Sequence, residues 1–407
     1  MSKSSRRILY VTSCWPGGAS FGGQLRALHI GRALQQMGQV TVAVVSSDGA
    51  TPELTTSTAA EFAVDPAIRV NPQPNQGILQ RLRWAFNPHF LNVHGCVANP
   101  EDRSRLLRRL NEFDLVWVLN SRTPNILNQW DWPGAVLDLD DVPSMYQRSL
   151  WQNGSGWREK WKAGVQMQLL RRRERFWRKR FSVLSVCSEA DRQYLGGGPS
   201  IHVIPNGFER PAQEPRRQPA DPPRLGFIGL YSYAPNREGT EWFIRSCWNE
   251  IKQQVPDARL RLVGKDTDGH FKPQAPDVDA LGYVADPAAE IATWSAMIVP
   301  VLHGAGTRVK IADAFSRKCP VISTQLGAFG YEVQTDRELL LADQPADFVK
   351  ACISLLRDRA AASAMADRAY AAFLEKWTWD AIAPRVWAAA EDCLRLRRAV
   401  ERDLNHR

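Results

Sequence analysis

The sequence predicts an α/β protein made of two doubly wound domains, and two observations lead to this prediction. Short apolar segments of strand length alternate with segments of helical periodicity along most of the 407 residues. A stretch with five prolines among sixteen residues, 208–223, separates an N-terminal from a C-terminal run of this kind. We therefore expect domains at 1–207 and 224–375, an extended linker at 208–223, and C-terminal helices at 376–407.

The N-terminal run opens with a strand, a loop, a helix and a second strand. Residues 8–13 are apolar, residues 17–23 are rich in glycine, and residues 40–46 are again almost continuously apolar after a segment of helical spacing. Such strands are typical of a parallel sheet that is covered on both faces. The further strands expected in this domain are 115–119, 135–139, 183–187 and 202–204.

The C-terminal run repeats the alternation directly after the linker. We expect its strands at 224–229, 260–263, 297–301 and 321–324. The helices expected between them are 237–254, 286–296 and 308–317, and the last ~35 residues read as helical.

Composition restricts the classes of partner and cofactor. The formal net charge of +9 favours anionic partners, and because no nucleic-acid motif accompanies the charge we expect no nucleic-acid partner. Seven scattered cysteines without a C-x-x-C pair predict neither disulfides nor zinc, and no carboxylate or histidine spacing predicts another metal. No apolar run approaches the ~18 residues of a membrane span, so we expect a cytoplasmic protein that at most lies on a membrane surface.

The strongest functional pattern lies at residues 299–315. A strand leads into a loop that contains Gly304 and Gly306, and the following helix starts with Arg308 and Lys310. Free N–H groups at a helix start attract phosphate, whereas the helix dipole disfavours cations there, so the two cations are best explained by a bound anion. Asp313, about one turn further on, is placed to accept hydrogen bonds from a ribose. The alternative is a solvated helix start with incidental charges.

This pattern resembles the donor-binding signature of glycosyltransferase family 4 (glycosyl transferases group 1), in the sub-group that reads Gly-Gly-Gly-Thr-Arg-Leu-Lys. Further segments resemble the family in the expected order along nearly the whole chain, namely 22–26, 203–207, 227–229 with 235–236, 256–264, 282–284 and 377–379. The resemblance implies the GT-B fold, in which two Rossmann-like domains face a central cleft and a C-terminal helix crosses back to the N-terminal domain.

The resemblance also implies an activity. The chain would be a hexosyltransferase-type enzyme that moves a sugar from a nucleotide-diphosphate sugar to a saccharide or lipid-linked acceptor hydroxyl with retention, in cell-envelope polysaccharide, glycolipid or glycoconjugate synthesis. Arg308, Lys310 and Asp313 would carry catalysis, and no metal would be needed because fixed cations neutralise the leaving diphosphate. The implied donor-binding residues are Gly229, Arg237, Gly264, Tyr283, Val284, Gly304, Ala305, Gly306 and Thr307.

The chain departs from the family at one position of the donor signature. The family's two acidic residues, eight apart, would fall on Ala305 and Asp313, so a carboxylate that would touch the donor sugar is absent and backbone N–H groups must serve there. A nucleotide-sugar epimerase or a catalytically silent nucleotide-sugar-binding protein of the same fold remains as an alternative. A dehydrogenase is disfavoured because the G-x-G-x-x-G fingerprint is missing.

The acceptor side is expected in the N-terminal domain. Gly22, Gly23 and Arg26 resemble the family's N-terminal Gly-Gly loop, where glycine lets the backbone approach a ligand closely, although a tight turn is the alternative. Asp140 and Asp141 follow a predicted strand at the edge where open α/β sheets bind ligands. Helix capping together with solvation explains these carboxylates equally well.

The segment 157–181 is strongly basic and interleaved with aromatic residues. Ten Lys or Arg and two Glu give residues 158–180 a local charge of +8. A basic, aromatic helix is typical of a segment that lies on an anionic membrane surface. The alternative is a helix that packs its tryptophans on the domain and leaves its basic face in water.

Overall fold

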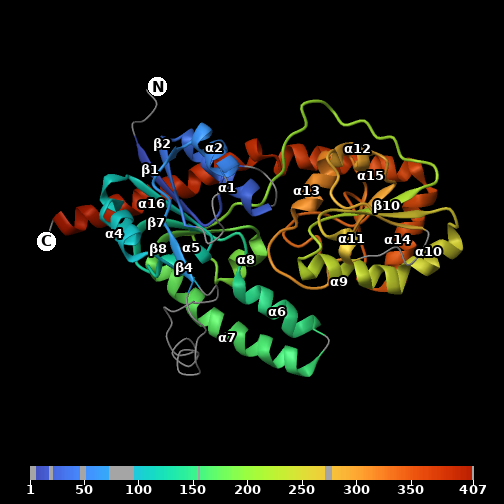
Figure 1. The fold of residues 1–407 in the computed structure, drawn as a ribbon, viewed down its shortest axis with the longest axis horizontal. Helices are drawn as coiled ribbons and strands as arrows, with labels where there is room; N and C mark the ends of the chain where they lie inside the picture. Colours follow the sequence, from blue (N-terminus) through green and yellow to red (C-terminus); the bar gives the residue numbers. More distant parts are fainter. Residues whose placement is uncertain are drawn as a thin grey trace. The chain divides into compact units, whose positions relative to one another are not determined.

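The computed structural model describes residues 6–17, 22–45, 52–72, 96–154, 156–270 and 277–405. The chain separates into two compact units (Figure 1). Unit 1 comprises Met1–Arg148, Trp161–Asn206 and Ile382–Arg407, and unit 2 comprises Ser149–Lys160 and Gly207–Ala381. The division after Asn206 lies one residue from the end of the expected N-terminal domain. The assignment of Ser149–Lys160 to unit 2 has no counterpart in the sequence analysis.

Unit 1 contains a seven-stranded parallel sheet in the order β3-β2-β1-β6-β7-β8-β9. Its strands are β1 (Arg7–Thr12), β2 (Gln39–Val44), β3 (Ala63–Val64), β6 (Leu115–Leu119), β7 (Trp132–Asp138), β8 (Phe181–Val186) and β9 (Ile201–Val203). Strand order reverses between β1 and β6, which is the doubly wound arrangement that the sequence predicts. A short antiparallel pair, β4 (Val70–Pro72) and β5 (Cys96–Ala98), stands apart from this sheet.

Helices connect these strands, and the first helix begins with two glycines. Gly22 and Gly23 are the first residues of α1, so the expected glycine loop gives way to a helix start, while residues 18–21 lie outside the described part of the chain. The helical elements are α1 (Gly22–Gln35), α2 (Pro52–Glu61), α4 (Pro100–Arg108), η1 (Leu110–Glu112), α5 (Arg122–Leu127), α6 (Pro143–Asn153), α7 (Trp157–Arg180) and α8 (Glu189–Tyr194).

Unit 2 contains a six-stranded parallel sheet in the order β12-β11-β10-β13-β14-β15. Its strands are β10 (Arg224–Ile228), β11 (Arg259–Val263), β12 (Val278–Ala280), β13 (Ala296–Val299), β14 (Val321–Ser323) and β15 (Leu340–Leu341). Its helices include α11 (Thr267–His270), α12 (Pro287–Ala292), α13 (Val309–Ser316), α14 (Pro345–Arg357) and α15 (Arg359–Lys376).

The helix expected at 237–254 is longer and interrupted. It consists of α9 (Ala234–Phe243), a π-helical turn (Ile244–Trp248) and α10 (Asn249–Gln254). Pro235 stands in the first turn of α9, where its fixed φ and missing N–H are tolerated, so the helix begins three residues before the expected start.

Central strands of both sheets are buried on two faces. Successive side chains of a strand point to opposite sides, and all five residues of β6 in unit 1 are buried. In β11, Leu260 and Leu262 join one core cluster while Val263 joins the other, and in β13 the residues Ile298 and Val299 divide in the same way. The apolar runs noted in the sequence therefore fit strands with helices on either face.

The final helix, α16 (Trp379–Asn405), contributes its residues from Ile382 onward to unit 1. Trp387 donates its indole N–H to the carbonyl of Ala33 in α1 at 2.9 Å, and His202 contacts Asp392 at 2.9 Å. Within the described residues, no helix has the length and apolar character needed to cross a membrane.

Candidate functional site

The loop between β13 and α13 is shaped by two glycines with left-handed backbone conformations. Gly304 has φ +138° and Gly306 has φ +72°, values that side-chain-bearing residues rarely adopt. A Cβ atom at Gly304 would lie 2.3 Å from a terminal nitrogen of Arg308. Glycine at 304 is therefore required for the position that the Arg308 side chain takes. The N–H of Gly304 donates to the Ser149 hydroxyl at 3.0 Å.

Arg308 is the N-cap residue of α13 and folds back over this loop. Its side chain donates to the carbonyl oxygens of Gly306, at 3.0 Å, and of Ala305. The residue is only 9% exposed, and its own carbonyl accepts from the Tyr331 hydroxyl at 3.0 Å. The guanidinium is thus a fixed positive charge in the loop. Thr307 and Ala305, both buried, complete the loop backbone.

Lys310 lies one residue inside α13 and points toward the start of α9. Its Nζ donates to the Asn236 side-chain oxygen at 2.7 Å and lies 4.2 Å from the centre of the Phe227 ring. Burial, followed by the positive charge of Arg308, lowers the pKa of Lys310 to about 7. Lys310 is therefore a cation that titrates near neutral pH, and a nearby anion would favour its charged form.

Asn236 is a site residue to which the sequence analysis assigned no role. Its side-chain nitrogen donates to the carbonyl of Leu230 at 2.8 Å, while its oxygen accepts from Lys310. The residue is buried at 8% exposure. Asn236 thereby connects the loop after β10 with the first turn of α13. The signal was present, because the pair Pro235–Asn236 was among the segments that resemble the family.

Asp313 follows on α13 and is paired within its own helix. Its carboxylate accepts from Nε of Arg317, and the residue is 8% exposed. Burial raises the pKa of Asp313, and Arg317 opposes this shift. Its role toward a ribose is a prediction; in this structure the carboxylate is occupied by Arg317.

The loops after β10 and β11 meet at the same edge of the sheet. Gly264 has φ +133°, and a Cβ atom there would lie 1.8 Å from the carbonyl oxygen of Gly229. The N–H of Gly264 donates to the carbonyl of Gly282 at 2.8 Å, which brings the segment before Tyr283 to this edge. Tyr283 is 80% exposed, whereas Val284 packs against a core cluster.

Arg237 and His303 flank this edge and both face Glu238. His303 contacts the Glu238 carboxylate at 2.7 Å, and Arg237 forms long ion pairs, at 3.9 Å to Glu238 and 4.0 Å to Glu241. The predicted donor residues thus gather around the carboxyl ends of β10, β11 and β13, where open α/β sheets bind ligands. Among the described residues no group of three or more His, Cys, Asp or Glu is arranged to hold a metal.

In unit 1, Arg26 is fully buried and anchors the segment before Gly207. Its guanidinium forms an ion pair with Asp138 at 2.5 Å and donates to the carbonyl of Ile204 at 3.0 Å and to the Asn206 side chain at 2.9 Å. Because the side chain has no exposed surface, Arg26 positions other groups in this structure. Gly22 and Gly23 contribute backbone N–H groups at the start of the same helix.

The three carboxylates after β7 have different surroundings. Asp138 is fully buried and accepts from Arg26 and from the Ser185 hydroxyl at 2.6 Å. Asp140 accepts from the Asn206 side-chain nitrogen at 2.7 Å, and Asp141 is exposed. The first carboxylate thus belongs to the interior of the unit, while the two named in the sequence analysis lie toward its surface.

One segment of the chain matches a known family model. Residues 222–358 match the family model described as glycosyl transferases group 1. A stretch of 157 residues, 36% of this chain, is 24% identical to an uncharacterized 44.6 kDa protein in the cps region of Klebsiella pneumoniae. That match spans 40% of the length of the relative.

Solved structures resemble the whole chain in fold. HepE of Anabaena in complex with UDP and glucose superposes with a TM-score of 0.61 at 15% identity, covering 94% of this chain and 98% of that one. Sucrose-phosphate synthase of Thermosynechococcus elongatus superposes with a TM-score of 0.63 at 16% identity, covering 93% and 97%. The chain therefore has the GT-B fold, and its residues 222–358 match the glycosyl transferases group 1 family.

Proposed function

We propose that this protein is a glycosyltransferase that moves a sugar from a nucleotide-diphosphate sugar to an acceptor hydroxyl. The observation that carries the proposal is the pairing of Arg308 and Lys310 at the first turn of α13, beside the glycine loop after β13. When the anomeric C–O bond breaks, the departing nucleoside diphosphate gains negative charge. Fixed cations and N–H donors at that point stabilise the transition state more than the ground state.

The comparisons support the donor class. The match of residues 222–358 to glycosyl transferases group 1 covers the β10, β11 and β13 loops, and HepE of the same fold binds UDP and glucose. In this proposal the diphosphate contacts Arg308, Lys310 and the N–H groups of residues 305–307, since the N–H of Gly304 already donates to Ser149. The base lies near Tyr283 and Val284, the ribose near Asp313, and Gly229, Gly264 and Arg237 border the donor.

The protonation state of Lys310 is expected to change when the donor binds. The ammonium is partly discharged near neutral pH, because burial lowers its pKa to about 7. A diphosphate beside it favours the charged form, so donor binding draws a proton onto Nζ. We propose that this charge, together with that of Arg308, neutralises the departing diphosphate without a divalent metal.

Retention of the anomeric configuration is part of the proposal and rests on the resemblance to family 4. The acceptor hydroxyl then attacks from the face that the diphosphate leaves. Ala305 contributes only its backbone N–H toward the sugar, since it carries no carboxylate. Proton NMR of the product, which distinguishes α from β linkages by the anomeric coupling constant, tests this step.

The acceptor is proposed to bind unit 1 and to be a cell-envelope saccharide or a lipid-linked saccharide. This choice of acceptor rests on the basic, aromatic segment 157–181, which suits an anionic membrane surface. Gly22, Gly23 and Asp140 are the residues proposed to border the acceptor, with Arg26 holding Asn206 and Asp138 behind them. Asp141, which is exposed, is the further carboxylate proposed for an acceptor hydroxyl.

We also propose that the protein is cytoplasmic and lies peripherally on an anionic membrane surface. Trp157, Trp161 and Val165 follow one another at four-residue spacing on α7 and are 74%, 66% and 43% exposed. Residues at this spacing share one face of a helix, and exposed tryptophans beside cations suit a lipid interface. Arg158 and Lys162, both exposed, flank this stripe.

The decisive experiment measures donor binding and turnover separately. A thermal-shift panel of UDP, GDP, ADP, dTDP and CDP, with their sugars, identifies the nucleotide, and release of nucleoside diphosphate is then measured with and without acceptor. Acceptor-dependent release supports a transferase. Binding without any release identifies a silent binding protein, and interconversion of the free nucleotide sugar identifies an epimerase.

A further inference from the structure

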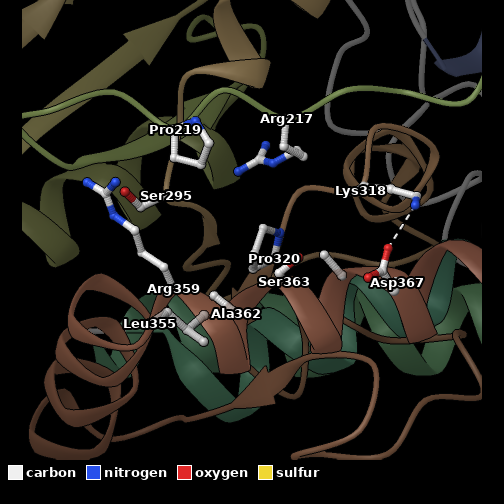
Figure 2. A pocket seen from close by; sticks show the side chains of 11 residues that line it. Arg217, Pro219, Ser295, Lys318, Pro320, Leu355, Arg359, Ala362, Ser363 and Asp367 are labelled. Carbon is white, nitrogen blue, oxygen red and sulfur yellow. Dashed lines mark hydrogen bonds and ion pairs between the residues drawn. The ribbon is translucent and has the colours of Figure 1, made fainter.

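A cavity of about 280 Å³ lies in unit 2, away from the proposed donor loop. It is bounded by the linker residue Arg217, by Ser295 and Lys318, which precede β13 and β14, and by α15 (Figure 2). The donor loop follows the carboxyl end of β13, whereas this cavity lies at the amino end. At ~3.3 Å per residue, the four residues of β13 separate the two edges by roughly 13 Å, so the cavity is a separate site.

The cavity combines a cationic rim with an apolar wall. Figure 2 shows Arg217 on the linker above the cavity and Arg359 rising from α15, with its guanidinium beside Ser295, while Leu355 and Ala362 lie below. Arg217 donates to the carbonyls of Ile291, at 2.8 Å, and Trp294, which orient its guanidinium without neutralising it. Lys318 differs, because its charge is balanced by Asp367 and Glu214.

The third cation of the rim, Arg359, is exposed. It makes no ion pair among the residues that the structure describes, although it is the first residue of α15. A cation at that end of a helix is disfavoured by the helix dipole. An anion bound by Arg359 and Arg217 would offset this cost, because each guanidinium can donate two parallel hydrogen bonds to phosphate oxygens.

We infer that this cavity is a binding site for a small phosphate monoester. Two guanidinium groups suit a phosphate, the hydroxyls of Ser295 and Ser363 add hydrogen-bonding groups, and the apolar wall accepts the small body that carries the phosphate. A volume of about 280 Å³ is small for a complete nucleotide sugar. The occupant is therefore different from the proposed donor.

A phosphate bound in this cavity would add contacts between the linker, residues 208–223, and the rest of unit 2. The linker already runs along the end of α12, since the N–H of Gln218 donates to the carbonyl of Ala292 at 3.0 Å and that of Ala220 to the carbonyl of Thr293 at 2.9 Å. A phosphate held by both Arg217 and Arg359 adds a direct connection between the linker and α15.

Isothermal titration calorimetry of the full chain tests the site, with inorganic phosphate and glucose 6-phosphate as probes at constant ionic strength. Arg359→Gln is expected to weaken binding of both probes about tenfold or more, because one charged hydrogen-bond partner is lost. Lys350→Gln, which removes a charge from an 80% exposed side chain on α14, is the matched control and should leave binding unchanged. Ser363→Leu should also abolish binding by filling the cavity.

The titration is repeated with saturating UDP so that binding at the donor loop is not mistaken for binding here. Phosphate binding that persists with UDP and is lost in Arg359→Gln supports the site, whichever probe binds more tightly. Absence of binding, or equal binding by wild type and Arg359→Gln, overturns it. If UDP itself does not bind, the proposed function fails. The comparison of Arg359→Gln with Lys350→Gln still tests whether phosphate binds in this cavity.

Discussion

The side-chain oxygen of Asn236 lies 2.7 Å from Nζ of Lys310 and connects the loop after β10 to the first turn of α13. The same amide donates to the carbonyl of Leu230 at 2.8 Å, so it cannot rotate without losing a hydrogen bond. The amide carries no charge and therefore orients the ammonium without neutralising it. This arrangement leaves the charge of Lys310 available to a diphosphate.

Asn236→Ala is expected to weaken nucleoside diphosphate binding by about 10- to 100-fold, since a hydrogen bond to a charged group contributes about 1.5–3 kcal/mol. Calorimetric titration with the nucleotide identified by the thermal-shift panel measures the effect. Asn249→Ala, an exposed asparagine at the start of α10, is the matched control and should bind as wild type does. Equal affinities for the two variants would remove Asn236 from the site.

The affinity for nucleoside diphosphate is expected to fall as the pH rises above 7. The pKa of Lys310 is lowered to about 7 by burial and by Arg308, and a bound diphosphate raises it again. Binding therefore takes up a proton above the unliganded pKa, and the slope approaches a tenfold loss of affinity per pH unit. Lys310→Arg, which stays charged, should flatten this profile, and an unchanged slope in that variant would contradict the assignment.

The same pKa shift sets the sign of a stability effect. Folding lowers the pKa of Lys310 from its ordinary value of 10.5, so the unfolded chain binds the proton more tightly. The contribution of Lys310 to the free energy of unfolding should therefore rise with pH between about 7 and 10.5 and be flat below 7. Comparing the pH dependence of urea midpoints for wild type and Lys310→Gln isolates this contribution.

Arg308→Ala is expected to lower the rate of sugar transfer about 10²- to 10³-fold, as found when one donor to a developing anion is removed. Nucleoside diphosphate binding should weaken as well. Steady-state kinetics with saturating acceptor measure the loss. Arg337→Ala removes a side chain that is 62% exposed in the same unit and serves as the control. A normal rate in Arg308→Ala would eliminate the proposed charge neutralisation.

Removal of divalent metal is expected to leave transfer unchanged, because Arg308 and Lys310 are proposed to neutralise the diphosphate. The rate is measured after dialysis against EDTA and again after addition of Mg²⁺ or Mn²⁺. A rate that depends on added metal would show that the two cations are insufficient.

The central strands of both sheets were predictable because they are buried on both faces. Runs such as residues 115–119 are apolar throughout and have the length of a strand rather than of a helix. The short strands β3, β12 and β15 are only partly buried and were not predicted. Helix limits were less predictable. The π-helical turn Ile244–Trp248 has no signature in local periodicity, and Pro235, in the first turn of α9, is equally compatible with a loop.

The loop between β13 and α13 was predictable from its glycines, whereas the side-chain partners in it were not, and its role toward a donor stays a prediction. Sequence spacing places Arg308 and Lys310 together but gives no sign that Asn236, 74 residues away, meets Lys310. It likewise gives no sign that Arg26 is buried. These contacts depend on how separate loops and helices pack, which local sequence does not encode.

The double variant Trp157→Ser/Trp161→Ser is expected to reduce binding to vesicles of anionic phospholipid. Burying a large apolar side chain contributes about 1.5–3 kcal/mol. Removal of both tryptophans should therefore lower the membrane partition coefficient by more than tenfold. Vesicle flotation measures it. The basic residues at 171–173 make a second test, but Arg173 is 2% exposed and must be spared, so Arg171→Gln/Arg172→Gln is used. Unchanged flotation of both variants would show that α7 does not bind the membrane and has a structural role.

The buried ion pair between Arg26 and Asp138 gives a stability prediction that is independent of catalysis. Both side chains have no exposed surface, so Arg26→Met leaves a buried carboxylate without its cation and should lower the free energy of unfolding by about 3–5 kcal/mol. Asp138 still accepts from Ser185 and Trp117, which preserves part of its environment. The double variant Arg26→Met/Asp138→Leu should be less destabilised than the sum of its single variants, because it leaves no isolated charge. Urea unfolding of the three variants measures this coupling, and strictly additive effects would show that the pair does not act as a unit.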